Sequence, residues 1–288
     1  MKTYKQLFII ISLFINFYAE PNNNDKQFYD YVDAIVYQDS SYCYVEREGK
    51  ILTKYKIKDG YLPQHFYYDR YSGLININQT RELDSRYSEF VLTIWDYKND
   101  KSWDVLVGKF SEGEGLKIPT VYGYNPIQNN GIIYYRGWEW SWLELLKDGN
   151  EIDLPKLRNW DSVEILGILS DNEIVISTSN PYDEDTTYFQ LYNLEKDSLE
   201  LLTNADLLDF ENTILATTGK NIQLFGKNHK RGISYYWDTN WNSEGSAFIS
   251  RYFNSSLKKS EYYLYDYIQK KEIPIDVDKE FFRVIWKD

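Results

Sequence analysis

The chain has 288 residues, of which 43% are hydrophobic, so it can bury a sizeable core and stands at the upper end of single-domain length. Its formal net charge of -12 at pH 7 repels phosphate backbones and anionic headgroups, which excludes nucleic acid as an expected partner. The single cysteine, Cys43, excludes an intramolecular disulfide. The two histidines, His65 and His229, are far apart in the sequence, so we expect no metal and no other cofactor.

The first predicted element is a secretory signal peptide over residues 1–19. Lys2 and Lys5 precede the apolar run Leu7–Ile15, and Ala19 offers a small residue for cleavage. The run is shorter than the about 20 apolar residues of a membrane-spanning helix. We therefore expect a secreted or periplasmic protein without a membrane span; an uncleaved interfacial anchor is the alternative.

After the signal peptide, a polar linker is expected over residues 20–27 and one folded domain over residues 28–288. Aromatic residues make up 18% of the chain, with 28 tyrosines. Tyrosine, isoleucine, valine and phenylalanine favour strands, and scarce alanine argues against long helices. The fold class predicted from these residues is all-β.

Along this domain one unit recurs: an apolar strand, a polar loop, a strand that opens on an aromatic or apolar residue, a tight turn and a last strand. The copies run over Asp33–Thr53, Glu89–Thr120, Gly131–Pro155, Glu173–Thr203, Thr213–Phe225 and Ser246–Ile275. Their third strands open at Tyr42, Trp103, Trp142, Tyr188, Ile222 and Tyr262.

After the first, longer gap, these openings recur about every 40 residues, the period of four-stranded propeller blades. We predict a β-propeller of six blades, with five or seven allowed because the stretch from Tyr61 to Ser88 is ambiguous. The last strand, Glu280–Trp286, can close the ring against the N-terminal chain. A β-sandwich is the alternative, although it does not explain the recurring unit.

Two segments resemble the TolB-type propeller repeat, whose blades carry a Trp-Ser-Pro-Asp-Gly turn and a Tyr-x-hydrophobic-Asp third strand. They are Trp241–Gly245, followed by Ala247–Ser250, and Tyr262–Asp266; Leu169–Asn172 is a weaker copy of the turn. This resemblance implies a periplasmic or extracellular binding scaffold, and it carries no catalytic residues over to this chain.

Candidate binding residues lie in the loops that join second to third strands, which gather on one face of a propeller. On our alignment these loops are 95–102, 136–141, 178–187 and 251–260. Exposed tryptophans often mark a binding surface, although tryptophans of the 136–141 loop could instead pack between blades. The predicted site residues are Trp95, Asp96, Trp138, Trp140, Tyr182, Asp183, Tyr252 and Phe253.

An aromatic and acidic surface suits a neutral or cationic ligand, so a protein or a carbohydrate is the expected partner. No serine-hydrolase elbow, zinc-protease motif or phosphate loop occurs, and no catalytic residue is predicted. We therefore expect a non-enzymatic binding scaffold. The alternative is a carbohydrate-active hydrolase or lyase that uses paired carboxylates.

Overall fold

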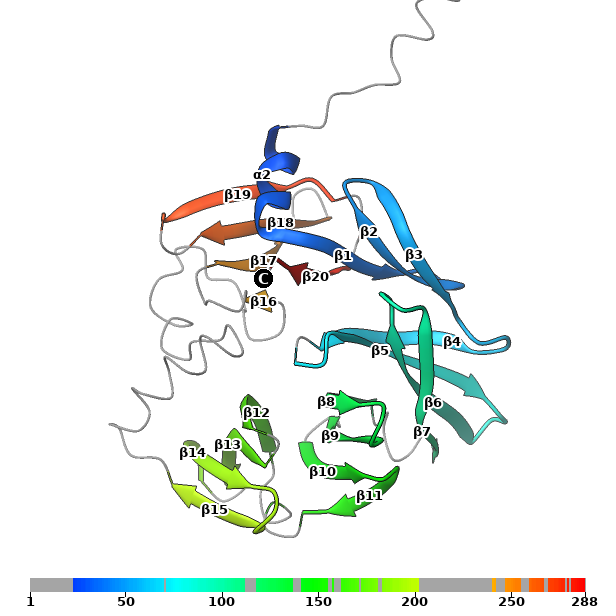
Figure 1. Ribbon diagram of the computed structural model, residues 1–288, viewed down its shortest axis with the longest axis vertical. Helices are drawn as coiled ribbons and strands as arrows, with labels where there is room; N and C mark the ends of the chain where they lie inside the picture. Colours follow the sequence, from blue (N-terminus) through cyan, green and yellow to red (C-terminus); the bar gives the residue numbers. More distant parts are fainter. Residues whose placement is uncertain are drawn as a thin grey trace, which may run out of the picture.

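The computed structural model describes an all-β protein with one short helix (Figure 1). The residues it describes are 23–69, 71–111, 118–136, 141–154, 157, 162–170, 172–180, 183–201, 240–241, 247–254, 259–266, 269–277, 279 and 281–287. In parts of the later strands only the backbone is described. Helix α2, Asn23–Tyr31, includes residues that were expected to belong to the polar linker.

The described strands form five antiparallel four-stranded sheets, which we call blades I to V (Figure 1). Blade I contains β20 (Arg283–Trp286), β1 (Val32–Gln38), β2 (Tyr42–Arg47) and β3 (Lys50–Lys56). Blade II contains β4 (Leu62–Asp69), β5 (Leu74–Glu82), β6 (Tyr87–Asp96) and β7 (Lys101–Ser111). Blade III contains β8 (Ile118–Asn125), β9 (Asn130–Arg136), β10 (Ser141–Lys147) and β11 (Asn150–Asp153).

Blade IV contains β12 (Ser162–Ser170), β13 (Glu173–Asn180), β14 (Asp183–Asn193) and β15 (Ser198–Leu201). Blade V contains β16 (Asn240–Trp241), β17 (Ala247–Asn254), β18 (Lys259–Asp266) and β19 (Lys271–Ile275). The five sheets surround a common centre, so the fold is a β-propeller (Figure 1). Of the predicted counts, five blades agree with the described residues and six are not supported; the predicted unit Thr213–Phe225 lies outside the description.

The ring is closed by the C-terminal strand, as the sequence predicted. β20 pairs antiparallel with β1, with Val32 opposite Trp286 and Ile35 opposite Val284. Helix α2 adds to this closure, because the Tyr31 hydroxyl donates a hydrogen bond to Asp266 of blade V at 2.6 Å. The two ends of the chain therefore stabilise the same pair of blades.

The sequence alignment was one strand out of step in blade II. The predicted unit Glu89–Thr120 starts in the third strand, β6, and ends in the first strand of blade III. Trp103 therefore lies in a fourth strand and not at the opening of a third. The ambiguous stretch between Tyr61 and Ser88 contains the first two strands of this blade.

Tight hairpins connect the outer strands of blades I and III, and their turn residues explain why. Asp148 and Gly149, between β10 and β11, have φ angles of 49° and 77°, and Glu48 and Gly49 have 51° and 76°. Two successive residues with positive φ form the turn whose twist matches the strands that flank it. Asp-Gly is a preferred sequence for such a turn, because glycine adopts positive φ without steric cost.

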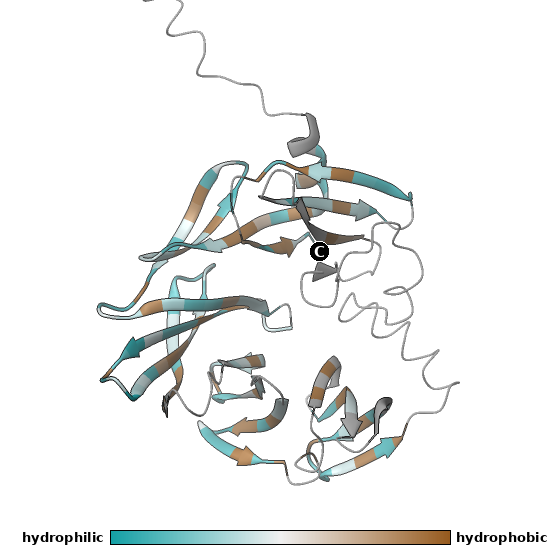
Figure 2. Cartoon of the chain, turned by 180° about the vertical axis from the view of Figure 1, so that it is seen from behind, coloured by the Kyte–Doolittle hydropathy of each residue, from teal (hydrophilic) through white to brown (hydrophobic). Residues whose placement is uncertain are grey.

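The hydrophobic core lies between successive blades and not inside any one of them. Four clusters of buried side chains fill the spaces between blades V and I, I and II, II and III, and III and IV. Hydrophobic and hydrophilic residues alternate along many strands (Figure 2). A strand presents alternate residues to its two faces, so each sheet buries side chains against a neighbouring blade.

Side chains of one blade also bond the backbone of the first strand in the next blade. Asn76 of β5 donates to the carbonyl oxygen of Val121 at 3.2 Å and accepts from its N–H at 3.0 Å. Ser141 of β10 makes the same pair of bonds with Val163 of β12, at 2.8 and 3.0 Å. These side chains pair with the strand edge as a further strand would, and thereby satisfy backbone groups that are costly to bury unpaired.

Candidate functional site

Two of the predicted binding residues, Trp95 and Asp96, occupy positions different from those expected. Trp95 is only 1% exposed and packs against the rings of Tyr55 and Tyr97 in the core between blades I and II. Asp96 accepts hydrogen bonds from the backbone N–H groups of Lys98 and Asn99. The expected loop is thus a turn between third and fourth strands, because the alignment was one strand out of step.

The other predicted loops overlap the connections from second to third strands, but they extend into strands: residues 178–180 belong to β13, 183–187 to β14, 251–254 to β17 and 259–260 to β18. The residues between these strands, 137–140, 181–182 and 255–258, lie outside the description. Trp138, Trp140 and Tyr182 lie outside the described residues. Asp183 starts β14, and Tyr252 and Phe253 lie within β17; the side chains of these three are not described. Their roles in binding stay predictions.

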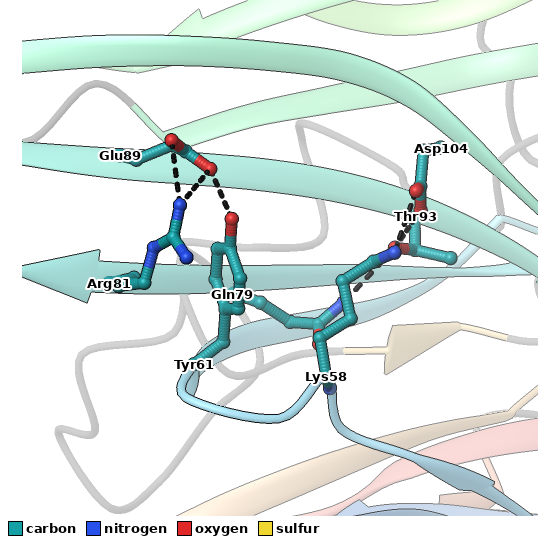
Figure 3. A network of polar contacts seen from close by, with 7 residues as sticks. All are labelled: Lys58, Tyr61, Gln79, Arg81, Glu89, Thr93 and Asp104. Carbon is teal, nitrogen blue, oxygen red and sulfur yellow. Dashed lines mark hydrogen bonds and ion pairs between the residues drawn. The ribbon is translucent and has the colours of Figure 1, made fainter.

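A polar network fixes the connection between blades I and II, residues 57–61, against blade II (Figure 3). The backbone N–H of Lys58 donates to Gln79 at 2.8 Å, and the Gln79 amide donates to Thr93 at 3.0 Å. The Lys58 ammonium and the Thr93 hydroxyl both donate to Asp104, at 2.7 and 2.9 Å. A lysine charge from the connection is thereby paired with a carboxylate of β7.

The part of this network on the left of Figure 3 is centred on Glu89. The Tyr61 hydroxyl and the Arg81 guanidinium both donate to the Glu89 carboxylate. The hydrogen bond from Tyr61, together with the Arg81 charge, lowers the pKa of Glu89. Arg81 also lies over the Tyr61 ring, 4.9 Å from its centre. Since these charged groups bond one another, we assign the network to holding the connection between blades I and II against blade II.

A second polar cluster has a different character, because it gathers acidic side chains on one face of a hairpin, where two of them accept hydrogen bonds from aromatic side chains. It lies on the hairpin of β10 and β11 and on β9 beside it. The register pairs Glu144 with Asp153 and Leu146 with Glu151, so the three acidic side chains share one face of the sheet. We call this set, with Tyr135 and Trp142, the acid–aromatic cluster.

The aromatic half of the cluster is a stacked pair. The rings of Tyr135 and Trp142 have centres 4.5 Å apart and planes only 11° from parallel. The Tyr135 hydroxyl donates to Glu151 at 2.8 Å, and the Trp142 indole N–H donates to Glu144 at 3.0 Å. Both rings belong to the seam between blades II and III, which holds the stack in place.

The acidic half is electrostatically strained. Burial raises the pKa of Glu144, and a hydrogen bond and charge repulsion from Glu151 raise it further, followed by the charge of Asp153. The hydrogen bond from the Trp142 indole acts in the opposite direction. Burial and the bond to Glu151 also raise the pKa of the Tyr135 hydroxyl. Carboxyl groups with perturbed pKa values often belong to functional sites.

Sequence reasoning missed this cluster, although a signal for it was present. The Asp148–Gly149 turn fixes the hairpin register, and that register places Glu144, Glu151 and Asp153 on one face. Among the described residues, no group of three or more histidine, cysteine, aspartate or glutamate side chains is arranged to hold a metal ion. In the same part of the chain no helix has the length and hydrophobicity needed to cross a membrane.

Comparison with solved structures finds oligogalacturonate lyases. One, in complex with manganese, shares 11% sequence identity at a TM-score of 0.43; the match covers 86% of this chain and 64% of that one. Another, from Vibrio parahaemolyticus, shares 9% identity at a TM-score of 0.41, with 84% and 61% covered. The chain therefore spans less than two thirds of the length of either lyase. No family model and no curated protein matches this sequence, so TolB-type membership stays a prediction from its residues.

Proposed function

We propose that this protein is an exported, non-enzymatic binding propeller whose acid–aromatic cluster takes a cationic group, such as a lysine or arginine side chain of a partner protein. The observation that carries the proposal is the placement of three acidic side chains on one face of the hairpin beside the Tyr135–Trp142 stack. Like charges opposite each other on a sheet cost stability. A bound cation removes that cost, and aromatic faces attract cations as well.

The charge of the whole protein supports the same class of partner. A net charge of -12 attracts a cationic partner over a distance set by the ionic strength, and it accelerates the encounter. Overall attraction gives no specificity, however. If binding is specific, removing two negative charges from the cluster lowers the affinity for the cationic partner more than removing two negative charges elsewhere on the protein.

A tetralysine peptide tests this requirement by calorimetric titration at low salt. We expect the double variant Glu144→Gln/Glu151→Gln to lose affinity roughly thirtyfold, the effect of removing an interface hot spot of about 2 kcal/mol. The matched control is Glu82→Gln/Glu200→Gln, which removes two exposed charges from β5 and β15. Equal losses in both variants, or no binding by the unaltered protein, would contradict the proposal.

The second candidate is a carbohydrate-active enzyme, favoured by a carboxyl pair in which Glu144 has a raised pKa. Enzymes separate acid and base roles by shifting the pKa values of two such groups apart. Glycosidases, however, place their two carboxyl groups on either side of the sugar bond, about 5–10 Å apart, whereas Glu144 and Glu151 lie on one face of a single hairpin. Oligogalacturonate, named for the neighbouring lyases, is anionic and is repelled by this acidic protein.

Lyase activity is measured directly by the ultraviolet absorbance of the unsaturated product released from oligogalacturonate. The binding proposal predicts no release. Product formation by the unaltered protein, abolished in Glu144→Gln but kept in Glu200→Gln, would replace that proposal with the enzymatic one.

A further inference from the structure

A β-bulge in the first strand of blade III sets the direction of the Tyr122 side chain. The register of β8 with β9 shifts between Tyr122 and Asn125, and Gly123 within the shift has a φ angle of 60°. A bulge changes the direction of the side chain beside it, and bulges are frequent next to active sites. β8 lies near the centre of the ring (Figure 1).

A carboxyl group of the neighbouring blade holds this bulge in place. Asp69, at the end of β4, is fully buried, and its Oδ2 accepts a hydrogen bond from the Gly123 N–H at 2.7 Å. The same carboxyl group accepts bonds from the Ser72 hydroxyl at 2.6 Å and from the Tyr71 N–H at 3.1 Å. Because its donors belong to the protein itself, Asp69 is a positioning residue for the bulge and is not itself exposed to a ligand.

Three half-buried tyrosines of blades II and III meet beside the bulge, and we call them the tyrosine cluster: Tyr67 of β4, Tyr122 of β8 and Tyr134 of β9. The Tyr122 ring lies edge to face with both neighbours, 5.3 Å from the centre of the Tyr67 ring and 6.3 Å from that of Tyr134. Burial raises the pKa of Tyr122 well above its ordinary value. Its hydroxyl therefore keeps its proton at neutral pH, and it can both donate and accept a hydrogen bond.

The Tyr122 hydroxyl makes no hydrogen bond within the part of the chain that the structure describes. The hydroxyl of Tyr124, two residues along the same strand, donates to Asn129 at 2.9 Å. Yet the Tyr122 oxygen is not one of the described buried side-chain atoms without a partner, so solvent reaches it. The side chain is thus closely surrounded but open at its polar end, as in a ligand pocket lined by aromatic residues with a few polar groups.

We propose that the tyrosine cluster binds a neutral sugar ring. The apolar face of the sugar packs against tyrosine rings, and its hydroxyl groups exchange hydrogen bonds with the Tyr122 hydroxyl. A cation would meet no open carboxylate there, because Asp69, the carboxyl group that acts on Tyr122, is buried and already bonded. An anionic sugar is repelled by the net charge of -12.

This site is separate from the acid–aromatic cluster, although β9 contributes to both. Tyr134 and Tyr135 are adjacent in β9 and therefore lie on opposite faces of the sheet. Tyr134 packs in the seam between blades III and IV, whereas Tyr135 packs between blades II and III. The inference is therefore independent of the proposed function.

Titration with hexoses, followed by ligand-detected nuclear magnetic resonance, tests the proposal. Glucose, galactose and mannose are the neutral probes, and glucosamine and glucuronate carry opposite charges on a similar ring. We expect at least one neutral hexose to bind more tightly than either charged sugar. Tyr122→Phe should weaken that binding about three- to tenfold, the effect of one hydrogen bond.

Two controls separate the site from stability and from the proposed function. Tyr122→Phe should keep the urea midpoint of the unaltered protein, because the hydroxyl it removes bonds no described residue, and Tyr124→Phe should keep the sugar affinity. Glu144→Gln/Glu151→Gln should also keep it. No binding of any neutral hexose, tighter binding of a charged sugar, equal affinity in Tyr122→Phe, or a loss in Glu144→Gln/Glu151→Gln would each overturn this inference, whereas the proposed function is judged by the tetralysine titration alone.

Discussion

Replacement of Asn76 by alanine is the most informative perturbation of the fold. The side chain is 1% exposed and bonds both the N–H and the carbonyl oxygen of Val121, which is fully buried. Each buried polar group left without a partner costs about 1–3 kcal/mol. Asn76→Ala orphans two backbone groups at once, so the free energy of unfolding should fall by about 2–6 kcal/mol.

Asn78 provides a matched control in the same strand, two residues away. It is also buried, but its amide bonds only the carbonyl oxygen of Pro119, since proline has no N–H. Asn78→Ala orphans one group and should therefore cost about 1–3 kcal/mol, half the loss expected for Asn76→Ala. Urea unfolding followed by circular dichroism measures both. Equal losses, or a loss below about 1 kcal/mol for Asn76→Ala, would refute the idea that this side chain replaces a strand.

Three other predictions concern Glu144, Cys43 and the pair Trp138 and Trp140. The raised pKa of Glu144 means that the folded state binds the Glu144 proton more tightly than the unfolded state does. The free energy of unfolding should therefore fall as pH rises through that pKa. In unfolding curves measured at several pH values, Glu151→Gln should weaken this dependence on pH. Burial raises the pKa of the Cys43 thiol, so a thiol reagent should modify it only after denaturation. If Trp138 and Trp140 are exposed, changing both to alanine should shift stability by under about 0.5 kcal/mol while weakening peptide binding; a loss of 3–5 kcal/mol per residue in a melting experiment would place them between blades.

The sequence determined the local structure of this protein. Strand-forming residues and tight turns predicted an all-β propeller, and the third strands expected at Tyr42, Trp142, Tyr188 and Tyr262 all occur. The closing strand was also predicted. Each of these features depends on the alternation of side chains along a strand or on the residues of a turn. Residues close together in the sequence determine both.

Only the tertiary structure decided the limits of blade II and the composition of the acid–aromatic cluster. The second strand of that blade, β5, was ambiguous in the sequence because it contains the polar residues Asn76, Asn78 and Gln79. Such residues are stable inside a strand only when another segment supplies their hydrogen-bond partners. Those partners are Val121, Pro119 and residues of the network around Lys58, all distant in the sequence. The cluster likewise depends on packing: the hairpin register places its acidic residues on one face, but the seam between two blades holds the aromatic stack, and burial raises the pKa of Glu144.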